Sequence, residues 1–277
     1  MEAAELLKQG KLDDALARLQ EQVRSDPAAA KHRVFLFQLL AVMGRWDKAL
    51  TQLNVAADLD PKTLLMAQVC RQTLQCEAFR AEVFAGRRSP LVFGQPDEWV
   101  GWLIQANQLA AEGRYAQSVE MRNKALEAAP AVAGNVDGKP FEWLADADPR
   151  LGPVLEAIVD GKYFWIPMRN IQQISVEPPA DLRDIVWLPA NFTWANGGVG
   201  VGMIPSRYPG TEAVDDGPLR LARRTDWRTL GPDLDVPLGQ RLFATNDGDY
   251  PLLALKRITF DVPAAPMNFD VPAVPDK

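Results

Sequence analysis

The sequence predicts an α+β protein in which tetratricopeptide-like helical hairpin repeats precede a small, mainly-β domain with one helix. Two observations support this class: a helix-hairpin repeat in the first half, and short apolar segments between turn-forming residues in the second. We expect a repeat domain over residues 1–130, a twisted sheet or partly closed barrel over 131–260, and a proline-rich tail over 261–277. A chain of 277 residues is long enough for two cores.

The repeat is carried by three segments with one layout: Gly, then Leu or an aromatic residue two positions on, Ala or Ser five on, and Pro 17 on. Gly10, Gly44 and Gly113 open these segments, and Gly10 to Gly44 is one 34-residue period. Glycine permits the turn between two helices, and proline ends the second helix. Residues 62–96 are expected to form a degenerate unit, because they are helical by period but lack the glycine turn.

Repeats of this kind stack into a curved array whose inner face is lined by the first helix of each pair. The register predicts an inner row that is rich in amides and nearly uncharged. This row binds a peptide or a helix, or it packs against the second domain, and the sequence favours neither alternative. Its members are Val34, Gln38, Gln68, Gln72, Leu103 and Asn107.

The second half begins with one expected short helix, from an N-cap at Asp148 to a stop at Gly161, because Leu151, Val154 and Ile158 have helical spacing. Strand-like segments separated by Pro, Gly, Asn and Asp follow. They read YFWIPM, IQQISVE, DIVWLP, NFTWA, VGVGMIP, LRLAR, RLFAT and LLALKRITF.

The glycine-rich stretch WANGGVGVG, residues 194–202, does not fit a nucleotide-binding loop. It lacks G-x-G-x-x-G and G-K-[ST], and Pro205 and Pro209 prevent the helix that such loops require. Asn196 and Gly197 instead predict a hairpin with a type I′ turn, and the following glycines permit a bulge or a close approach by another backbone. Most tryptophans of this half are expected in the core, but we consider three side chains as parts of a helix-docking surface: Trp187, Trp194 and Met203.

Catalytic chemistry has little support in the sequence. His32 is the only histidine, so a His-based metal site or catalytic triad has no second member. Four aspartate pairs are candidates for a hydrolase, but each lies beside Gly or Pro, where Asp usually caps or turns the chain. We expect no catalytic residue, no metal and no cofactor. The pairs are Asp146 with Asp148, Asp215 with Asp216, Asp233 with Asp235, and Asp247 with Asp249.

Composition narrows the class of partner. A net charge of −6 lacks the basic excess of a nucleic-acid-binding surface. No run of 18 apolar residues occurs, and the charged, amphipathic start differs from a signal peptide. We therefore expect a cytoplasmic protein without nucleic-acid or membrane partners. Cys70 and Cys76 lie about 240° apart on a helix and are expected to be reduced core thiols.

Two further features leave alternatives open. Arg223, Arg224 and Arg228 around RRTDW suit an anion clamp, but alternating charge on an exposed strand is commoner. The sequence FDVPA occurs at residues 260–264 and again at 269–273. The prolines there favour an extended, exposed tail, and docking of Phe269 is the alternative.

Several strings together resemble the ImpE/TagJ family of type VI secretion accessory proteins. They are DPRLGPVLEAIVDGKYFWIP, LRDIVWLPA, IPSRYPGTE and RRTDW, placed after a repeat half that ends GRYAQSVEMRNKALEAAP. The resemblance extends to about Phe260. It implies an adaptor that binds the N-terminal helix of the small contractile-sheath subunit, associated in some secretion classes with the ATPase that dismantles the contracted sheath. It brings no catalytic residues.

The leading hypothesis is that an amphipathic sheath helix binds in a groove between the repeats and the sheet domain, and that this binding influences sheath assembly or disassembly. A general repeat-based peptide adaptor or chaperone is the first alternative, although such adaptors usually present inward Lys and Arg side chains to a C-terminal tail. An uncharacterised hydrolase that uses an Asp pair is the second.

Overall fold

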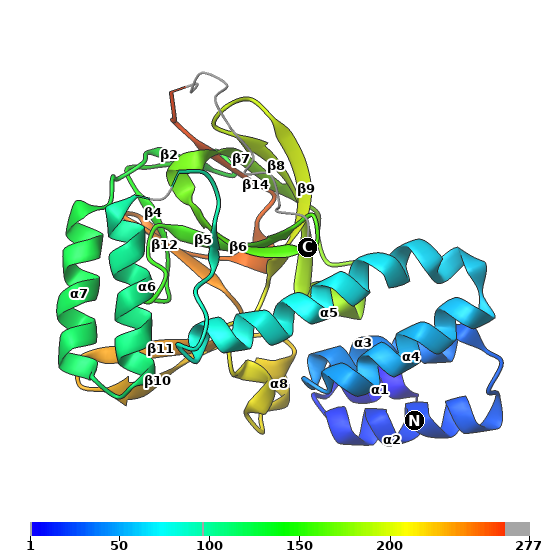
Figure 1. Ribbon diagram of the computed structural model, residues 1–277. Helices are drawn as coiled ribbons and strands as arrows, with labels where there is room; N and C mark the ends of the chain where they lie inside the picture. The colour runs from blue at the N-terminus through cyan, green and yellow to red at the C-terminus, as the bar shows by residue number, and fades with distance from the viewer. Residues whose placement is uncertain (1, 96, 264–277) are drawn as a thin grey trace, which may run out of the picture.

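The computed structural model describes residues 2–95 and 97–263, in which tetratricopeptide-like helices are followed by a mainly-β domain, as predicted (Figure 1). Three helix pairs turn at the predicted glycines, whose φ angles are +75° at Gly10, +67° at Gly44 and +75° at Gly113. The helices are α1 (Ala3–Lys8), α2 (Leu12–Ser25), α3 (Ala30–Val42), α4 (Trp46–Leu59), α5 (Leu64–Phe84), α6 (Glu98–Ala111) and α7 (Tyr115–Ala128).

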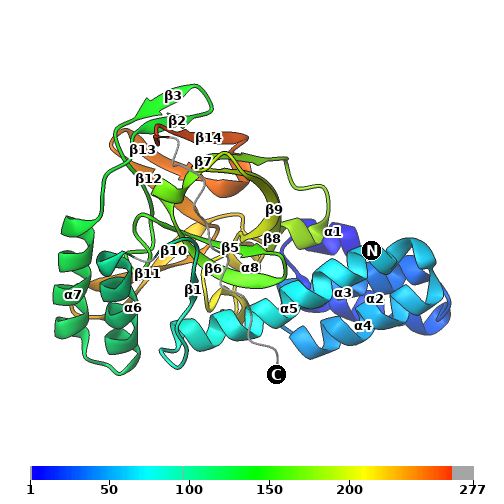
Figure 2. The same cartoon turned by 45° about the horizontal axis from the view of Figure 1, so that its top comes forward.

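The degenerate unit at residues 62–96 contains one long helix, α5, in place of a hairpin. The chain then enters β1 (Leu91–Val92), which pairs in parallel with β6 (Lys162–Pro167) of the sheet. Helix α5 runs from α3 and α4 toward α6 and α7, so the last helix pair is separated from the first two (Figures 1 and 2). The repeats therefore do not form one uninterrupted curved stack.

The main sheet has nine strands among the described residues and is not closed, so the twisted-sheet alternative is correct. All of its strand pairs except β1–β6 are antiparallel. In spatial order the strands are β1 (Leu91–Val92), β6 (Lys162–Pro167), β5 (Val154–Val159), β9 (Val199–Pro205), β8 (Trp187–Trp194), β7 (Ile171–Val176), β14 (Arg257–Phe260), β2 (Gly134–Val136) and β3 (Lys139–Phe141).

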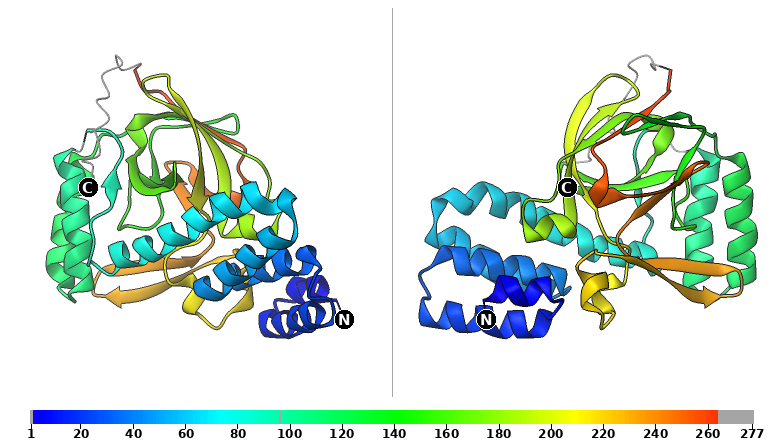
Figure 3. Two further views of the ribbon diagram at one scale, coloured as in Figure 1. Left: turned by 45° about the vertical axis from the view of Figure 1, so that its right-hand side comes forward. Right: turned by 180° about the vertical axis from the view of Figure 1, so that it is seen from behind.

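Smaller sheets complete the domain. The hairpin formed by β10 (Thr225–Gly231) and β11 (Leu234–Gly239) reaches toward α6 and α7 (Figure 3), where Leu234 and Val236 pack with Ala110. A three-stranded sheet consists of β13 (Gly248–Pro251), β12 (Leu242–Thr245) and β4 (Leu144–Asp146). One apolar cluster joins the helices to the main sheet, and a second joins the main sheet to β4 and β12.

The helix predicted over residues 148–161 is wrong, because Val154–Val159 form strand β5. All six residues of β5 are buried, so its apolar side chains serve both faces of the sheet and lack the alternation of a half-exposed strand. Asp160 and Gly161, with φ angles of +49° and +69°, make the two-residue turn into β6. Gly161, expected to end a helix, therefore belongs to a strand-to-strand turn, since a glycine with positive φ is used in both.

The segment LRLAR is also not a strand. It contributes to the short helix α8 (Gly217–Arg220), which is the α-helix of the second half in the described residues. The carboxylate of Asp216 accepts a hydrogen bond from the Leu219 amide at 2.8 Å, which caps this helix. DIVWLP and NFTWA, expected as two strands, contribute WLP and NFTW to the single strand β8, and the first residues of DIVWLP lie in the 3-10 turn Leu182–Ile185.

The predicted hairpin at Asn196 and Gly197 is confirmed, since it joins β8 to β9. Its type I′ turn is wrong, because Gly197 has a φ of +82° but Asn196 is not among the residues with positive φ. The Gly197 amide donates to the Trp194 carbonyl at 2.8 Å, and the Trp194 amide donates to the Gly198 carbonyl at 2.8 Å. The turn is therefore wider than a two-residue loop.

Two arginines of the second half attach the first helices to the sheet domain. Arg207, which is buried, donates to the carbonyl of Val42 at the end of α3, at 2.8 Å. Arg223 donates to the carbonyls of Leu7 and Lys8 at the end of α1, at 2.8 and 2.7 Å. Cations at helix C-termini satisfy carbonyls that lack a partner within the helix. Arg223, one of the three arginines for which an anion clamp was the less common alternative, thus caps a helix.

Candidate functional site

A groove of about 400 Å³ lies between helix α5 and the sheet, and we call it the α5–β9 groove. Helix α5 contributes Val69, Gln72 and Thr73 to its wall. The sheet contributes backbone and side chains from β5, β8, β9 and the turn after β5, among them Ile158, Asp160, Pro189, Asn191, Val201 and Met203. Asp160 is the one ionisable residue in the lining, so the groove is nearly uncharged.

Helix α5 leaves apolar side chains in solvent beside this groove. Leu65, Val69 and Gln72 follow a helical spacing of four and three residues, which places them on one face. Leu65 is 74% exposed and Val69 is 37% exposed. Cys70 and Leu74 on the same helix are buried in the core. An apolar stripe therefore extends the groove along α5.

Strand β9 provides the opposite wall with an apolar surface of its own. Val199 and Val201 are 81% and 69% exposed, and their spacing of two residues places them on one face of the strand. Position 202, between Val201 and Met203, requires glycine, because a Cβ there would lie 2.6 Å from the carbonyl oxygen of Ile158 on β5. A close approach by another backbone is therefore present at Gly202, whereas a Cβ at Gly198 or Gly200 would meet side chains.

The pairing of β9 leaves part of its edge without a strand. Strand β5 pairs with β9 at Met203 and Gly202. Residues 199–201 pair with β8 on one side, and no described strand pairs with them on the other. This segment combines exposed valines with unpaired backbone, so it is the part of the sheet best able to accept a partner.

Of the predicted binding residues, Gln72 and Met203 line the α5–β9 groove. Gln68 is exposed on α5 next to it, and Val34 is half-buried on α3. The structure thus brings together one residue from the predicted inner row and one from the predicted docking surface of the second half.

The other predicted residues lie in packing contacts and not on an open surface. The buried side chains are Gln38, Leu103, Asn107, Trp187 and Trp194. Asn107 donates to the Val83 carbonyl at 2.7 Å, and Trp187 donates from its indole nitrogen to Glu77 at 2.8 Å. Trp194 stacks on Phe192, with ring centroids 4.8 Å apart. Asn107 and Trp187 both bond to residues of α5, so these two side chains are engaged in contacts inside the protein.

Sequence reasoning missed a buried network of ion pairs between α5 and the sheet. Arg80 on α5 donates to Glu156 on β5. Arg241 pairs with both Glu156 and Asp146, and all four side chains are buried. Asp146 and Asp148 each accept a hydrogen bond from the backbone amide two residues on, as expected of turn residues, but both are buried, and Arg150 pairs with Asp148 at 2.6 Å. Isolated arginines and acids in the sequence gave no spacing signal for this network.

The two network carboxylates differ in pKa because they have different partners. Burial raises the pKa of Asp146 to about 7, against the attraction of Arg241. Burial also opposes ionisation of Glu156, but Arg80 and Arg241 outweigh it and lower the pKa of that carboxyl to about 2. The network holds α5 against the sheet and thereby fixes one wall of the α5–β9 groove.

Metal chemistry finds no support in the described residues, which contain no group of three or more His, Cys, Asp or Glu side chains arranged to hold an ion. Cys70 and Cys76 are free and buried, as predicted. In the same part of the chain, no helix has the length and apolar character needed to span a membrane.

Comparisons with known proteins agree with this architecture. A family model described as ImpE protein matches residues 138–259, and a tetratricopeptide repeat model matches residues 6–72. The chain is 52% identical over 261 residues to the type VI secretion system accessory component TagJ of Pseudomonas aeruginosa, covering 94% of this chain and 92% of that protein. An X-ray crystal structure of a Vibrio parahaemolyticus protein superposes with a TM-score of 0.85 at 24% identity, covering 93% of this chain and 97% of that one, which supports the fold.

Proposed function

This chain belongs to the ImpE/TagJ family of type VI secretion accessory proteins, and from that premise we propose that it is a non-enzymatic adaptor that binds a helix of the contractile sheath. The ligand is the N-terminal helix of the small sheath subunit, and it lies in the α5–β9 groove. Through this contact the protein influences sheath assembly, or disassembly by the sheath ATPase, in the cytoplasm.

The observation that carries the proposal is the exposed apolar lining of the groove. Val69 on one side and Val201 on the other line a concave, nearly uncharged groove and expose apolar surface to solvent, and Leu65 continues this surface along α5 outside the lining. An amphipathic helix binds such a surface by placing its apolar residues, spaced by three and four, into the groove. Burial of this surface by a partner helix is favourable at roughly 25 cal/mol per Å².

Asp160 gives the groove a preferred orientation for its ligand. It lies in the turn between β5 and β6 and is the charged member of the lining. A Lys or Arg side chain at the edge of the partner's apolar face would pair with this carboxylate. The amides of Gln72 and Asn191 provide neutral hydrogen-bonding groups beside it.

The test is a pull-down with a synthetic peptide of the sheath subunit's N-terminal helix. The full-length chain is expected to retain this peptide and to release a version whose apolar face carries charged residues. Equal retention of the two peptides, or retention of neither, contradicts the proposal. A general adaptor for C-terminal tails would instead retain unrelated peptides that end in a carboxylate.

A further inference from the structure

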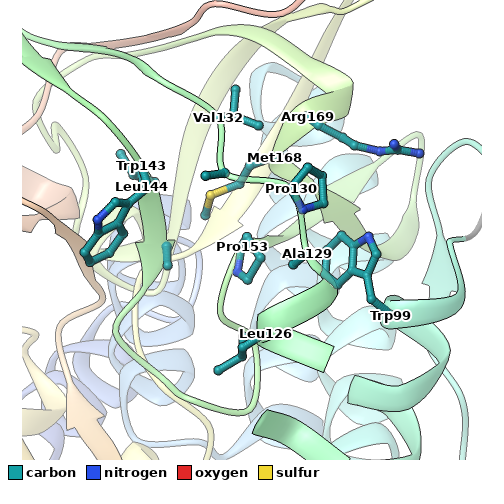
Figure 4. A pocket seen from close by; sticks show the side chains of 12 residues that line it. Trp99, Leu126, Ala129, Pro130, Val132, Trp143, Leu144, Pro153, Met168 and Arg169 are labelled. Carbon is teal, nitrogen blue, oxygen red and sulfur yellow. The ribbon is translucent and has the colours of Figure 1, made fainter. Parts of the chain in front are cut away.

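A second hollow lies on another part of the molecule, between α6, α7 and the strands that follow them (Figure 4). Its volume is about 200 Å³ and its lining is mostly apolar. Trp143 lies on one side and Trp99 on the other, with Met168 and Pro153 between them (Figure 4). We call it the Trp99–Trp143 hollow.

Water reaches apolar side chains in this hollow. Trp143 is 40% exposed and Leu126 is 36% exposed, although both lie among other apolar residues. Arg169 is the one charged residue of the lining. Its Nη2 forms an ion pair with Asp97 at 2.6 Å, and its Nε is buried without a hydrogen-bond partner among the described residues. The hollow therefore suits an aromatic or aliphatic side chain, and an acidic neighbour of that side chain would share Arg169 with Asp97.

The chain itself passes beside the hollow after its last strand. The amide of Asp261 donates to the carbonyl of Ala133 at 2.8 Å, and Ala133 directly follows Val132 in the hollow's wall. Residues 264–277 come next and lie outside the described residues. From Pro263 to Phe269 is six residues, which span up to about 20 Å when extended. Phe269 is therefore within reach of the hollow.

The first FDVPA copy shows how this sequence packs. Phe260 is buried and meets Phe141 edge to face, with ring centroids 5.8 Å apart. Val262 packs against the same apolar cluster as Val132. The second copy, at residues 269–273, repeats the Phe and Val side chains and places Asp270 next to Phe269.

We propose that the segment 264–277 binds the Trp99–Trp143 hollow of its own chain, with Phe269 in the apolar space and Asp270 paired with Arg169. The observations that carry this are the partly exposed tryptophan and leucine, the cation at the rim, and the exit of the chain beside Val132. Since the segment is tethered, its effective concentration at the hollow is on the order of millimolar, and weak contacts suffice. This proposal is independent of the sheath-binding proposal.

The experiment measures competition in full-length chains. A fluorescent peptide of residues 264–277 is titrated against the wild-type chain and against Phe269→Ala. The peptide is expected to bind Phe269→Ala about tenfold more tightly, because the wild-type segment competes for the hollow. Adding Trp143→Ala to Phe269→Ala should weaken peptide binding about tenfold, while adding Trp227→Ala, at a tryptophan that is 48% exposed elsewhere, should not.

Equal peptide binding to the wild-type and Phe269→Ala chains, or binding to neither, overturns the proposal. Analytical sedimentation measures the oligomeric state and so distinguishes binding within one chain from binding to a second copy. A wild-type dimer that becomes a monomer on Phe269→Ala would show that the segment binds a second copy, which overturns the assignment to its own chain.

Discussion

Arg80 on α5 holds Glu156 on β5 through two hydrogen bonds, with an Nε to Oε1 distance of 2.6 Å and an Nη2 to Oε2 distance of 3.0 Å. Both side chains are buried, and they lie 76 residues apart in the sequence. This pair joins the long helix to the centre of the sheet. It also places Val69 and Gln72, earlier on the same helix, opposite β9.

Replacing Arg80 with alanine is expected to lower the free energy of unfolding by about 3–5 kcal/mol, because it leaves a buried carboxylate with one fewer cation. Urea unfolding followed by circular dichroism measures this change. The matched control is Arg87→Ala, since Arg87 pairs with Glu82 at 2.6 and 2.7 Å but its side chain is 63% exposed. The control should destabilise the protein much less, because solvent weakens an exposed ion pair. Equal effects of the two substitutions would show that burial does not decide the strength of this pair.

The raised pKa of Asp146 leads us to expect that the protein becomes less stable as pH rises toward 7. Its pKa is raised to about 7 in the folded protein, from an ordinary value of 3.8. Between these values the folded state binds more protons than the unfolded state, so this residue makes the free energy of unfolding fall as pH rises toward 7. Since one pKa unit corresponds to about 1.4 kcal/mol, the whole effect is at most about 4 kcal/mol.

The measurement is the difference in free energy of unfolding between wild type and Asp146→Asn at several pH values. This difference should decrease from about pH 4 to pH 7 and level off above about pH 8. A difference for Asp146→Asn that rises with pH would show that Arg241 lowers the pKa of this carboxyl below its ordinary value.

The repeat half was predictable wherever a glycine had to adopt positive φ. Gly10, Gly44 and Gly113 fix three turns, and the 34-residue period fixes the helices between Gly10 and Gly44. Helix α5 was not predictable as a single crossing helix, since its partner surface is the sheet. Strand β5 was predicted as a helix because its apolar residues face both sides, and local spacing does not report what covers a segment.

The groove was predictable only in part. Gln72 and Met203 were chosen for separate reasons, and the structure brings them together because β9 follows β5 in the sheet and α5 crosses beside it. The network of Arg80, Glu156 and Arg241 depends on contacts between residues at least 76 positions apart. A single sequence carries no periodic signal for such contacts.

Trp194, predicted as part of a docking surface, is expected to act as a core residue. It is 7% exposed and its ring lies 4.4 Å from that of Phe93 and 4.8 Å from that of Phe192, measured between centroids. Trp194→Ala should lower the free energy of unfolding by about 3–5 kcal/mol. Trp227→Ala, at a 48% exposed position, should cost less than about 1 kcal/mol in the same urea titration. If Trp194→Ala is fully stable but no longer binds the sheath helix, Trp194 belongs to the docking surface and not to the core.

Two valines on one face of β9 test where a partner helix binds. Val201 lines the α5–β9 groove, whereas Val199 is more exposed but is not part of its lining. Val201→Asp is expected to weaken binding of the sheath helix at least about tenfold, because a carboxylate would enter the apolar contact beside Asp160. Val199→Asp introduces the same charge on the same strand and should change binding less than about threefold.

Fluorescence anisotropy of the labelled helix measures its affinity for both variants. Neither substitution should alter stability, since both side chains are exposed in the free protein. Equal binding by the two variants would place the partner away from this groove.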